Sequence, residues 1–283
     1  MSARTPESVS AVVCTLNSIS GIERCLNSLK AAGVAEIIVV DAGSDDGTRE
    51  IADRIADQVL EDRGLGLGNA RNVGIAASHG ALILNMGSDN VMPPGQLQVM
   101  IDDLTELQVQ GVSAQTRILG TDLVSRGLDA WRQGRFHPGF ADVIGTPTLF
   151  DGELLRAHPY DSSRRFSDDS ELCERWTEEF EARFAISRAY VEEIGKTTWP
   201  ELLIRCRMYG ISDHEVFREG KSQGWSLARQ AQSTLHPLKV DLVEPLSRLP
   251  IDRAVTAAPF LTVFTTLRYG YWAQTALRAA LKR

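Results

Sequence analysis

The sequence predicts an α/β fold, in which a doubly wound, mostly parallel sheet carries helices on both faces and a mainly helical extension follows. Two observations support this prediction. Short apolar runs alternate with amphipathic segments between residues 9 and 109, as in strands joined by helical crossovers. Several of these runs end abruptly in small, polar or acidic residues, and the carboxyl ends of parallel strands are where such sheets bind ligands.

The expected strands and helices differ in their sequence patterns. Each strand is a short apolar run, whereas the helices repeat apolar residues every three or four positions, as Ile22, Leu26 and Leu29 do. Pro93 and Pro94 are expected to start the last of these helices, because proline suits a first turn. The expected strands cover residues 9–14, 36–40, 58–61 and 81–86, and the helices that follow them cover residues 21–32, the segment from 48, 68–78 and 93–107.

Composition and charge exclude several classes of protein. The net charge of −7 argues against a general nucleic-acid binder, which needs a basic face. The four cysteines are widely spaced and form no CxxC pair, which predicts reduced thiols in a cytosolic protein, without a zinc site or disulfides. Residues 1–8 are polar and lack the apolar stretch of a secretory signal, and no run of about 18 apolar residues is present to span a membrane.

A glycine run, Gly64, Gly66 and Gly68, invites comparison with the dinucleotide-binding fingerprint. That fingerprint needs G-x-G-x-x-G directly after the first strand of a βαβ unit. Here Asn69 and Arg71 stand where the third glycine belongs in the two possible registers, and the run follows the third strand. The pattern therefore does not predict a nicotinamide or flavin site.

Six segments with weak individual signals follow one another in register. They are Thr15-x-Asn17, Asp41-x-Gly43-Ser44-x-Asp46-Gly-Thr, Gly68-Asn-Ala-Arg71-Asn72-x-Gly74, Gly87-Ser88-Asp89-Asn90, Gly145-Thr-Pro147-x-Leu149-Phe150 and Arg165-Phe-Ser-Asp168-Asp169-x-Glu171-Leu172. In order and spacing these segments resemble the family 2 glycosyltransferases, whose GT-A fold is a nucleotide-sugar-binding α/β domain. The resemblance is close over residues 9–109 and resumes at the last two segments.

The resemblance implies roles for the strand-end residues. Thr15 and Asp41 fall where the family binds the base and ribose, and a carboxylate can accept hydrogen bonds from both. The family often has a second aspartate after Asp41, where this chain has Ala42, so uracil is not specifically expected. Arg71 is expected to donate to the diphosphate or the base edge. The predicted nucleotide-sugar-binding residues are Thr15, Asn17, Asp41, Gly43, Ser44, Gly68, Arg71, Asn72, Ser88 and Asp89.

The resemblance also implies a divalent metal, Mn²⁺ or Mg²⁺. Family enzymes usually bind it through an Asp-x-Asp triplet, since hard cations favour oxygen ligands. The matching triplet here is Gly87-Ser88-Asp89, so the first aspartate is missing. We expect Asp89 to hold the metal directly or through water, with the diphosphate completing the shell, alone or with a later residue. His214 and His236 lie where some GT-A enzymes supply a histidine ligand, although a lone histidine is more often structural.

Asp168 and Asp169 fall where the family carries an acidic pair that includes the catalytic base. An inverting transferase needs a carboxylate to take the proton of the attacking acceptor hydroxyl. By register Asp169 is the expected base, and Asp168 is its neighbour. The alternative is a solvated acidic start of the helix expected over residues 170–181, where aspartates are favoured anyway.

The second half of the sequence leaves more alternatives open. The aromatic and basic segment 129–138 is either a loop that covers the donor or grips an acceptor sugar, or a packed surface helix. After Trp176 a closing strand is expected over 184–186, a helix start over 191–195, and two helices over 202–210 and 213–223.

Residues 254–283 contain no acidic side chain and combine basic residues with aromatic and aliphatic bulk. Phe264, Trp272 and Arg268 are examples. This composition is typical of an interfacial amphipathic helix on an anionic membrane surface. The alternative is a helix that packs on the domain or dimerises. The first interpretation predicts a peripheral protein on the inner face of the cell membrane, with a lipid-linked acceptor.

Together these observations predict an inverting, metal-assisted glycosyltransferase with a nucleotide-diphosphate sugar donor and a glycan or lipid-linked acceptor. The GT-A domain is expected over residues 1–200 and a helical extension over 201–283. A nucleotidyltransferase is a rival, but it usually has a glycine- and lysine- or arginine-rich loop where this chain reads Thr15-Leu-Asn17-Ser. A degenerate GT-A domain that only binds or scaffolds is a second rival, because Gly87 and Ala42 replace expected aspartates. Oligomeric state is left open.

Overall fold

The computed structural model describes residues 4–62, 64–162, 168–194 and 197–281. The chain divides into two compact units, described separately below. Unit 1 comprises residues 1–117 and 137–194, and unit 2 comprises residues 118–136 and 195–283. The second unit is therefore built from two stretches of chain that lie far apart in the sequence.

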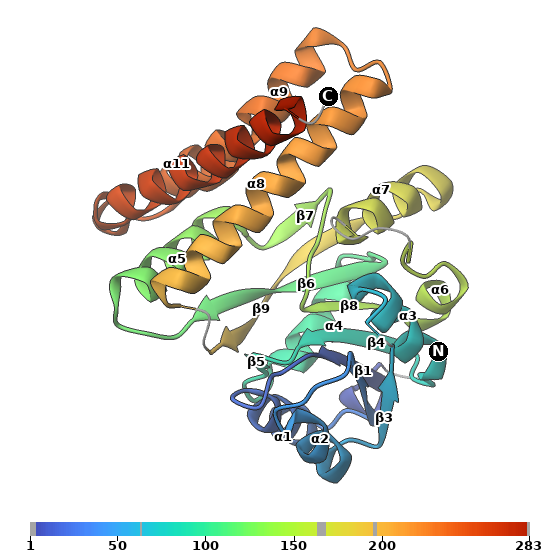
Figure 1. Cartoon of the computed structure of the whole chain (residues 1–283). Coiled ribbons are helices and arrows are strands. Elements are labelled where there is room, and N and C mark those ends of the chain that lie inside the picture. The colour runs from blue at the N-terminus through green and yellow to red at the C-terminus, as the bar shows by residue number, and fades with distance from the viewer. Residues whose placement is uncertain (1–3, 63, 163–167, 195–196, 282–283) are drawn as a thin grey trace. The chain divides into compact units, whose positions relative to one another are not determined.

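Unit 1 contains one sheet, in which the described residues form nine strands in the order β3-β2-β1-β4-β8-β6-β9-β5, with β7 pairing β9 (Figure 1). The strands are β1 (Val9–Thr15), β2 (Glu36–Asp41), β3 (Gln58–Glu61), β4 (Leu82–Gly87), β5 (Asn90–Val91), β6 (Gly111–Ile118), β7 (Gly139–Ala141), β8 (Thr148–Asp151) and β9 (Phe184–Glu193). Strands β3, β2, β1 and β4 pair in parallel, as the alternation of strands and helices predicts. Beyond β4 the sheet turns antiparallel at β8.

Helices cover both faces of the parallel part, so its strands are buried on both sides. Because side chains alternate across a strand, Val9, Ala11 and Val13 join one core cluster and Val12 joins another. The first cluster includes Leu26 of α1, and the second lies on the opposite face. The helices of unit 1 are α1 (Ile22–Ala31), α2 (Thr48–Ile55), α3 (Leu67–Ala77), α4 (Gln96–Glu106), α6 (Gly152–Ala157) and α7 (Asp168–Phe180), with a 3₁₀ turn at Pro6–Ser8.

Two expected boundaries in unit 1 are wrong. Helix α4 begins at Gln96 and not at the proline pair, because Gly95 at its N-cap has a left-handed φ of 78° that breaks the helix before that point. The helix start expected over 191–195 is instead the end of β9, which runs to Glu193 and pairs with Asn90 of β5. Val191 is buried in the sheet core.

Unit 2 is helical. Its elements are α5 (Leu123–Arg135), α8 (Trp199–Ser222), α9 (Leu227–Leu238), a π-helical turn η2 (Lys239–Val243), α10 (Glu244–Arg248) and α11 (Ile251–Leu281). The two helices expected over 202–210 and 213–223 are one continuous 24-residue helix, α8. Helices α8 and α11 lie side by side (Figure 1), and a side chain at Gly210 would place its Cβ 2.6 Å from the Arg268 carbonyl oxygen.

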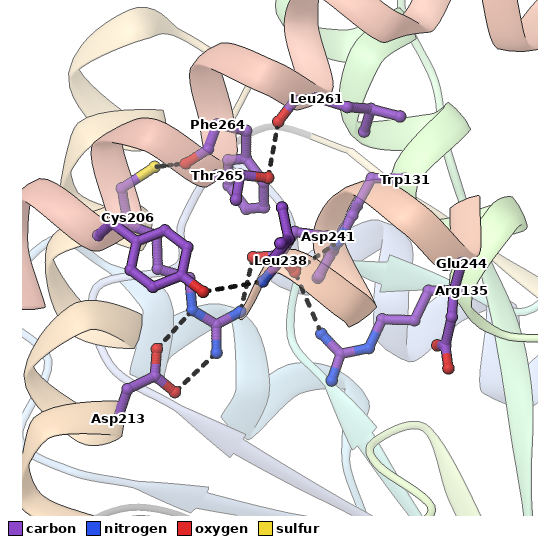
Figure 2. A network of polar contacts seen from close by, with 12 residues as sticks. Trp131, Arg135, Cys206, Asp213, Leu238, Asp241, Glu244, Leu261, Phe264 and Thr265 are labelled. Atoms are coloured by element: carbon purple, nitrogen blue, oxygen red, sulfur yellow. Dashed lines mark hydrogen bonds and ion pairs between the residues drawn. The ribbon is translucent and has the colours of Figure 1, made fainter. Parts of the chain in front are cut away.

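A buried polar network holds four elements of unit 2 together (Figure 2). The carboxylate of Asp241, on η2, is fully buried and accepts hydrogen bonds from Trp131 Nε1 at 3.0 Å and from Arg268 Nη1 at 2.8 Å. Arg135 Nη1 of α5 lies 3.6 Å from the same carboxylate. Asp213 of α8 receives two further hydrogen bonds from the Arg268 guanidinium, at 2.6 and 2.8 Å.

Burial in unit 2 bears on both open questions about the second half of the sequence. Segment 129–138 begins within a packed helix, since α5 extends to Arg135 and Trp131 is 1% exposed. In the tail, Phe260, Phe264 and Arg268 face the core of unit 2, so they do not form the membrane-facing surface expected of them. Among the residues described, no helix combines the length and apolar character needed to cross a membrane. The four cysteines are free thiols.

Candidate active site

The parallel strands of unit 1 bring three predicted segments to one edge of the sheet. Thr15, the last residue of β1, is in register with Asp41, the last residue of β2. Cys14 is in register with Gly87 at the end of β4, so the segment Gly87-Ser88-Asp89 follows from the same edge. The order β2-β1-β4 therefore gathers the predicted base, ribose and metal residues at the carboxyl ends of adjacent strands.

Asp41 is 1% exposed and shapes the loop that follows it. Its Oδ2 accepts hydrogen bonds from the backbone N–H groups of Gly43, at 3.2 Å, and Ser44, at 2.9 Å, and its Oδ1 accepts from the Ser44 hydroxyl at 2.5 Å. Gly43 has a φ of 97°, which favours glycine. These bonds hold the carboxylate in a fixed orientation, and Oδ1, which accepts only one of them, keeps acceptor capacity for a ligand.

Asn17 and Ser88 tie the three strand-end loops together. The Asn17 N–H donates to Ser44 Oγ at 2.9 Å, and Asn17 Oδ1 accepts from the Asp45 N–H at 3.0 Å, which joins the β1 and β2 loops. Ser88 Oγ donates to Ser18 Oγ at 2.9 Å, which joins the β4 and β1 loops. These predicted ligand-binding residues therefore also build the walls of the site.

Thr15 Oγ1 is a buried oxygen with no hydrogen-bond partner among the described residues. Leaving a buried polar group unpaired costs about 1–3 kcal/mol. Thr15 lies directly beside Asp41 across the β1–β2 pair. An unpaired hydroxyl next to an oriented carboxylate fits a ligand that supplies a polar atom at this point.

The metal prediction rests on a single carboxylate. Within the described ranges, no group of three or more His, Cys, Asp or Glu side chains is positioned to hold a metal ion. The Gly87 Cα lies against the Asp89 carboxylate, since a Cβ at residue 87 would be 2.7 Å from Asp89 Oδ1. Divalent Mg²⁺ is often held by one or two carboxylates together with substrate phosphates, so Asp89 fits a cation that arrives with a diphosphate. His214 packs its ring against Trp272, 5.9 Å between centroids, within unit 2.

Arg71 lies with the acidic pair. Its Nη1 donates to Asp168 Oδ2 at 2.6 Å and to Asp169 Oδ1 at 2.9 Å, and its Nη2 donates to the Thr146 hydroxyl at 2.5 Å. The Arg71 side chain is 6% exposed, whereas those of Asp168 and Asp169 are 14% and 24% exposed. The guanidinium therefore approaches the pair from the protein interior, and the carboxylates keep a face toward solvent.

Helix α3 can come this close because of Gly68. A Cβ at Gly68 would lie 3.3 Å from the Asp161 carbonyl oxygen and 3.8 Å from Asp168 Oδ2. Asn72, one turn further along, clasps the backbone of Tyr160: its Nδ2 donates to the Tyr160 carbonyl at 2.7 Å, and its Oδ1 accepts from the Tyr160 N–H at 3.0 Å. Gly68 and Asn72 thus dock α3 onto the residues around Tyr160, which precede the acidic pair.

A family model described as glycosyl transferase family 2 matches residues 10–163, more than half of the 283-residue chain. The chain belongs to glycosyl transferase family 2. The match covers the strand ends, Arg71 and Tyr160, and it stops shortly before the acidic pair.

Two curated relatives of this family 2 chain match part of it. The succinoglycan biosynthesis protein ExoO of Rhizobium meliloti is 35% identical over 123 residues, which cover 41% of this chain and 34% of the relative. Glycosyltransferase AglE of Haloferax volcanii is 34% identical over 91 residues, which cover 29% of this chain and 30% of the relative. The family 2 chain thus spans about a third of the length of these relatives.

Solved structures confirm the predicted GT-A fold for this family 2 chain. The mannosyltransferase PcManGT from Pyrobaculum calidifontis matches with a TM-score of 0.64 at 18% identity, covering 98% of this chain and 88% of that one. TarS from S. aureus, in a structure with UDP, matches with a TM-score of 0.51 at 15% identity, covering 97% of this chain and 92% of that one. At these identities the likeness establishes the fold.

Burial and neighbouring charges shift the pKa values of the acidic pair and Arg71 in this family 2 chain. Burial raises the pKa of the Asp169 carboxyl above its ordinary value, Arg71 opposes that rise, and Asp168 adds to it. Burial disfavours the charged form of Arg71, but the nearby carboxylates of Asp169 and Asp168 outweigh it and raise the Arg71 pKa. Two carboxylates thus share one guanidinium.

Tyr160 and Thr146 lie beside Arg71 and Asp169, although neither is among the predicted site residues. Thr146 was part of a segment matched to the family, and its hydroxyl contacts Arg71. Tyr160 precedes the acidic pair in a stretch without recognisable pattern, and it is 3% exposed. A buried tyrosine usually finds a partner for its hydroxyl, which is the one general signal that points to it.

Proposed function

We propose that the chain is an inverting glycosyltransferase that moves a sugar from a nucleotide-diphosphate donor to a hydroxyl of a glycan or a lipid-linked acceptor. The observation that carries the proposal is the Asp169 carboxylate. It is 24% exposed, its Oδ1 is held by Arg71 at 2.9 Å, and its pKa is raised by burial. A partly exposed, oriented carboxylate with a raised pKa is suited to general-base catalysis.

In the proposed reaction Asp169 accepts the proton of the acceptor hydroxyl. The acceptor oxygen forms a bond to the anomeric carbon while the bond from that carbon to the diphosphate oxygen breaks, and the electron pair leaves with the nucleoside diphosphate. Attack on the face opposite the leaving group inverts the anomeric configuration. Arg71 and Asp168 keep the base in place but do not gain or lose the proton themselves.

The proposed donor site is the strand-end cluster of Thr15, Asp41 and Ser88-Asp89. A nucleotide-sugar donor is supported by the fold of the chain. It is similar in fold to PcManGT, whose structure contains GDP-Man and Mn²⁺, and to TarS, whose structure contains UDP. Asp41 would accept from the nucleoside, and Thr15 would satisfy its unpaired hydroxyl there. A divalent cation bound through Asp89 would neutralise charge on the leaving diphosphate. The experiment below identifies the nucleobase of the donor.

Thermal stabilisation by nucleoside diphosphates tests this donor site. The melting temperature is measured with UDP, GDP, CDP or dTDP, each with Mn²⁺ or Mg²⁺. We expect the diphosphate that fits the site to raise it, because a ligand stabilises the state it binds by about 2.7 kcal/mol at 100 times its Kd. One base should give the largest shift, and that shift should shrink without metal. Asp89→Asn should lose the metal dependence and keep part of the nucleotide shift.

Two outcomes of this titration would contradict the proposal. If no diphosphate shifts the melting temperature of the wild-type protein, the donor site is refuted and the degenerate-domain alternative, which Gly87 and Ala42 favour, replaces the proposal. A melting shift without hydrolysis of any nucleotide sugar, in the presence of metal, would indicate binding without transfer.

A lipid-linked acceptor implies that the protein associates with an anionic membrane surface. The exposed apolar residues of α11 allow a test of this prediction. Val263 and Leu277 are 45% and 62% exposed, unlike the buried Phe264. The double change Val263→Glu and Leu277→Glu is expected to lower co-sedimentation with anionic vesicles several-fold without unfolding unit 2. Leu227→Glu on α9, where the leucine is 83% exposed, is the control for added charge. Equal sedimentation of all three proteins would remove the membrane from the proposal.

A further inference from the structure

Tyr160 is fixed between two parts of the candidate site. Its backbone is clasped by Asn72 of α3 through two hydrogen bonds, at 2.7 and 3.0 Å. Its ring lies 4.9 Å from the Arg71 guanidinium carbon, in a cation–π contact. The side chain is buried, so both its ring and its hydroxyl are held by protein groups.

The hydrogen bonds of the Tyr160 hydroxyl have a defined direction. Asn85 of β4 is also buried, and its Nδ2 donates to the Tyr160 hydroxyl oxygen at 3.3 Å. Because this amide supplies the hydrogen of that bond, and the Thr148 contact lowers the Tyr160 pKa as a donor does, the hydroxyl proton is free to donate to Asp169 Oδ1, 3.4 Å away. Burial raises the Tyr160 pKa well above its ordinary value, so the hydroxyl stays protonated.

We infer that Tyr160 is a positioning residue for the catalytic base, one that holds Oδ1 of Asp169 together with Arg71 and leaves Oδ2 to take the acceptor proton. The inference rests on the proposed function of Asp169 and adds the atom that reacts and the residue that selects it.

The surroundings of Oδ2 agree with this assignment. Gly145 faces it, and a Cβ at that position would lie 3.7 Å from Oδ2. The absence of a side chain there leaves room for a hydroxyl to approach. The Asp169 carboxylate also accepts a hydrogen bond from the Thr146 N–H, which favours its charged form. A carboxylate oxygen has two lone pairs, so a bond from the backbone does not prevent proton transfer.

The charged and titratable groups around Asp169 come from several elements. Arg71 lies on α3, Asp168 and Cys173 on α7, and Tyr160 on the segment between α6 and α7. The Cys173 pKa is raised by burial to about 12, so this thiol stays neutral across an ordinary assay range. A change at Tyr160 therefore acts on Asp169 against a background of one fixed cation and one neighbouring carboxylate.

The test is Tyr160→Phe, which removes the hydroxyl and keeps the ring over Arg71. Carbon-13 carboxyl NMR follows the titration of Asp169 whether or not the protein transfers sugar. The Tyr160 hydrogen bond favours the carboxylate, so its loss is expected to move the Asp169 pKa further upward. Tyr190→Phe, a tyrosine on β9 stacked on Arg117, is the matched control and should leave the Asp169 titration unchanged.

Turnover gives a second readout. In Tyr160→Phe the acidic limb of the pH profile of kcat should move to higher pH and kcat at its plateau should fall about tenfold, the order of one hydrogen bond to a charged group. KM for the donor and the melting shift with diphosphate should stay unchanged, which also shows that the variant is folded. An Asp169 titration identical to that of the wild type overturns the inference. A shifted titration in a protein that transfers no sugar would instead refute the proposed function and leave the contact intact.

Discussion

Asp169→Asn is expected to lower turnover by about 10²- to 10⁴-fold, the usual contribution of a general base. Asparagine keeps the shape and the hydrogen bond from Arg71 but cannot accept the acceptor proton. Because the proposed donor site lies at the strand ends, the melting shift with nucleoside diphosphate should remain within error of the wild type. Single-turnover transfer and thermal shift, measured on the same preparation, check the two halves of this result.

Asp168→Asn is the matched control, since Asp168 also bonds Arg71, at 2.6 Å. The charge of Asp168 raises the Asp169 pKa, so removing it should lower that pKa. In the wild type, activity should be lost as pH falls through the raised pKa of Asp169, and in Asp168→Asn the loss should occur at lower pH. If Asp169→Asn weakens nucleotide binding as much as turnover, Asp169 belongs to the donor site and is not the base.

Asp241→Ala is expected to destabilise the fold by about 3–5 kcal/mol, the usual loss when one partner of a buried ion pair is removed. Asp241 is 0% exposed, and the change leaves the Trp131 Nε1–H without its acceptor. It also removes the carboxylate that lies 3.6 Å from Arg135, a guanidinium whose pKa burial already lowers. Arg268 keeps its ion pair with Asp213, so the loss of Asp241 should affect Arg268 less than it affects Trp131 and Arg135.

Urea denaturation checks this loss, with tryptophan fluorescence as the probe because Trp131 is the side chain directly uncoupled. Asp252→Ala is the control, since Asp252 is an exposed aspartate in the first turn of α11. It should cost well under about 1 kcal/mol, as exposed charges usually do. If Asp241→Ala lowers the free energy of unfolding as little as Asp252→Ala does, the Asp241 network contributes little to stability.

The parallel half of the sheet and its strand-end residues were predictable because their signals are local. Each strand is an apolar run that ends at a polar turn, so Thr15 and Asp41 could be placed at strand ends from a few neighbouring residues. Period and turn chemistry also located α1 and α3 to within a residue or two and placed the start of α2 at Thr48. Relative positions of adjacent strand ends then follow from the parallel order.

Features that depend on distant partners were not predictable in this way. The pattern at Val191 is compatible with a helix, and only the place of β9 in the sheet, between β6 and β5, makes it a strand. Arg71 could be predicted as a residue of the site, but its hydrogen bonds to Asp168 and Asp169, nearly a hundred positions later, could not. Tyr160 has no local signal at all. The aromatic tail suggested a membrane surface because nothing in the sequence shows that Phe264 packs in the core of unit 2.

The split composition of unit 2 has a consequence for biosynthesis. Helix α5 emerges from the ribosome long before α11, yet its Trp131 finds its acceptor at Asp241 and its ring partner at Phe264, 5.4 Å away between centroids. Until those later residues are made, α5 exposes an apolar face between two stretches of unit 1. Nascent chains should therefore be most prone to aggregate in this interval. Chains truncated between Asp169 and Phe264 should be more prone to aggregation and proteolysis than the full chain, even though they contain all the proposed catalytic residues.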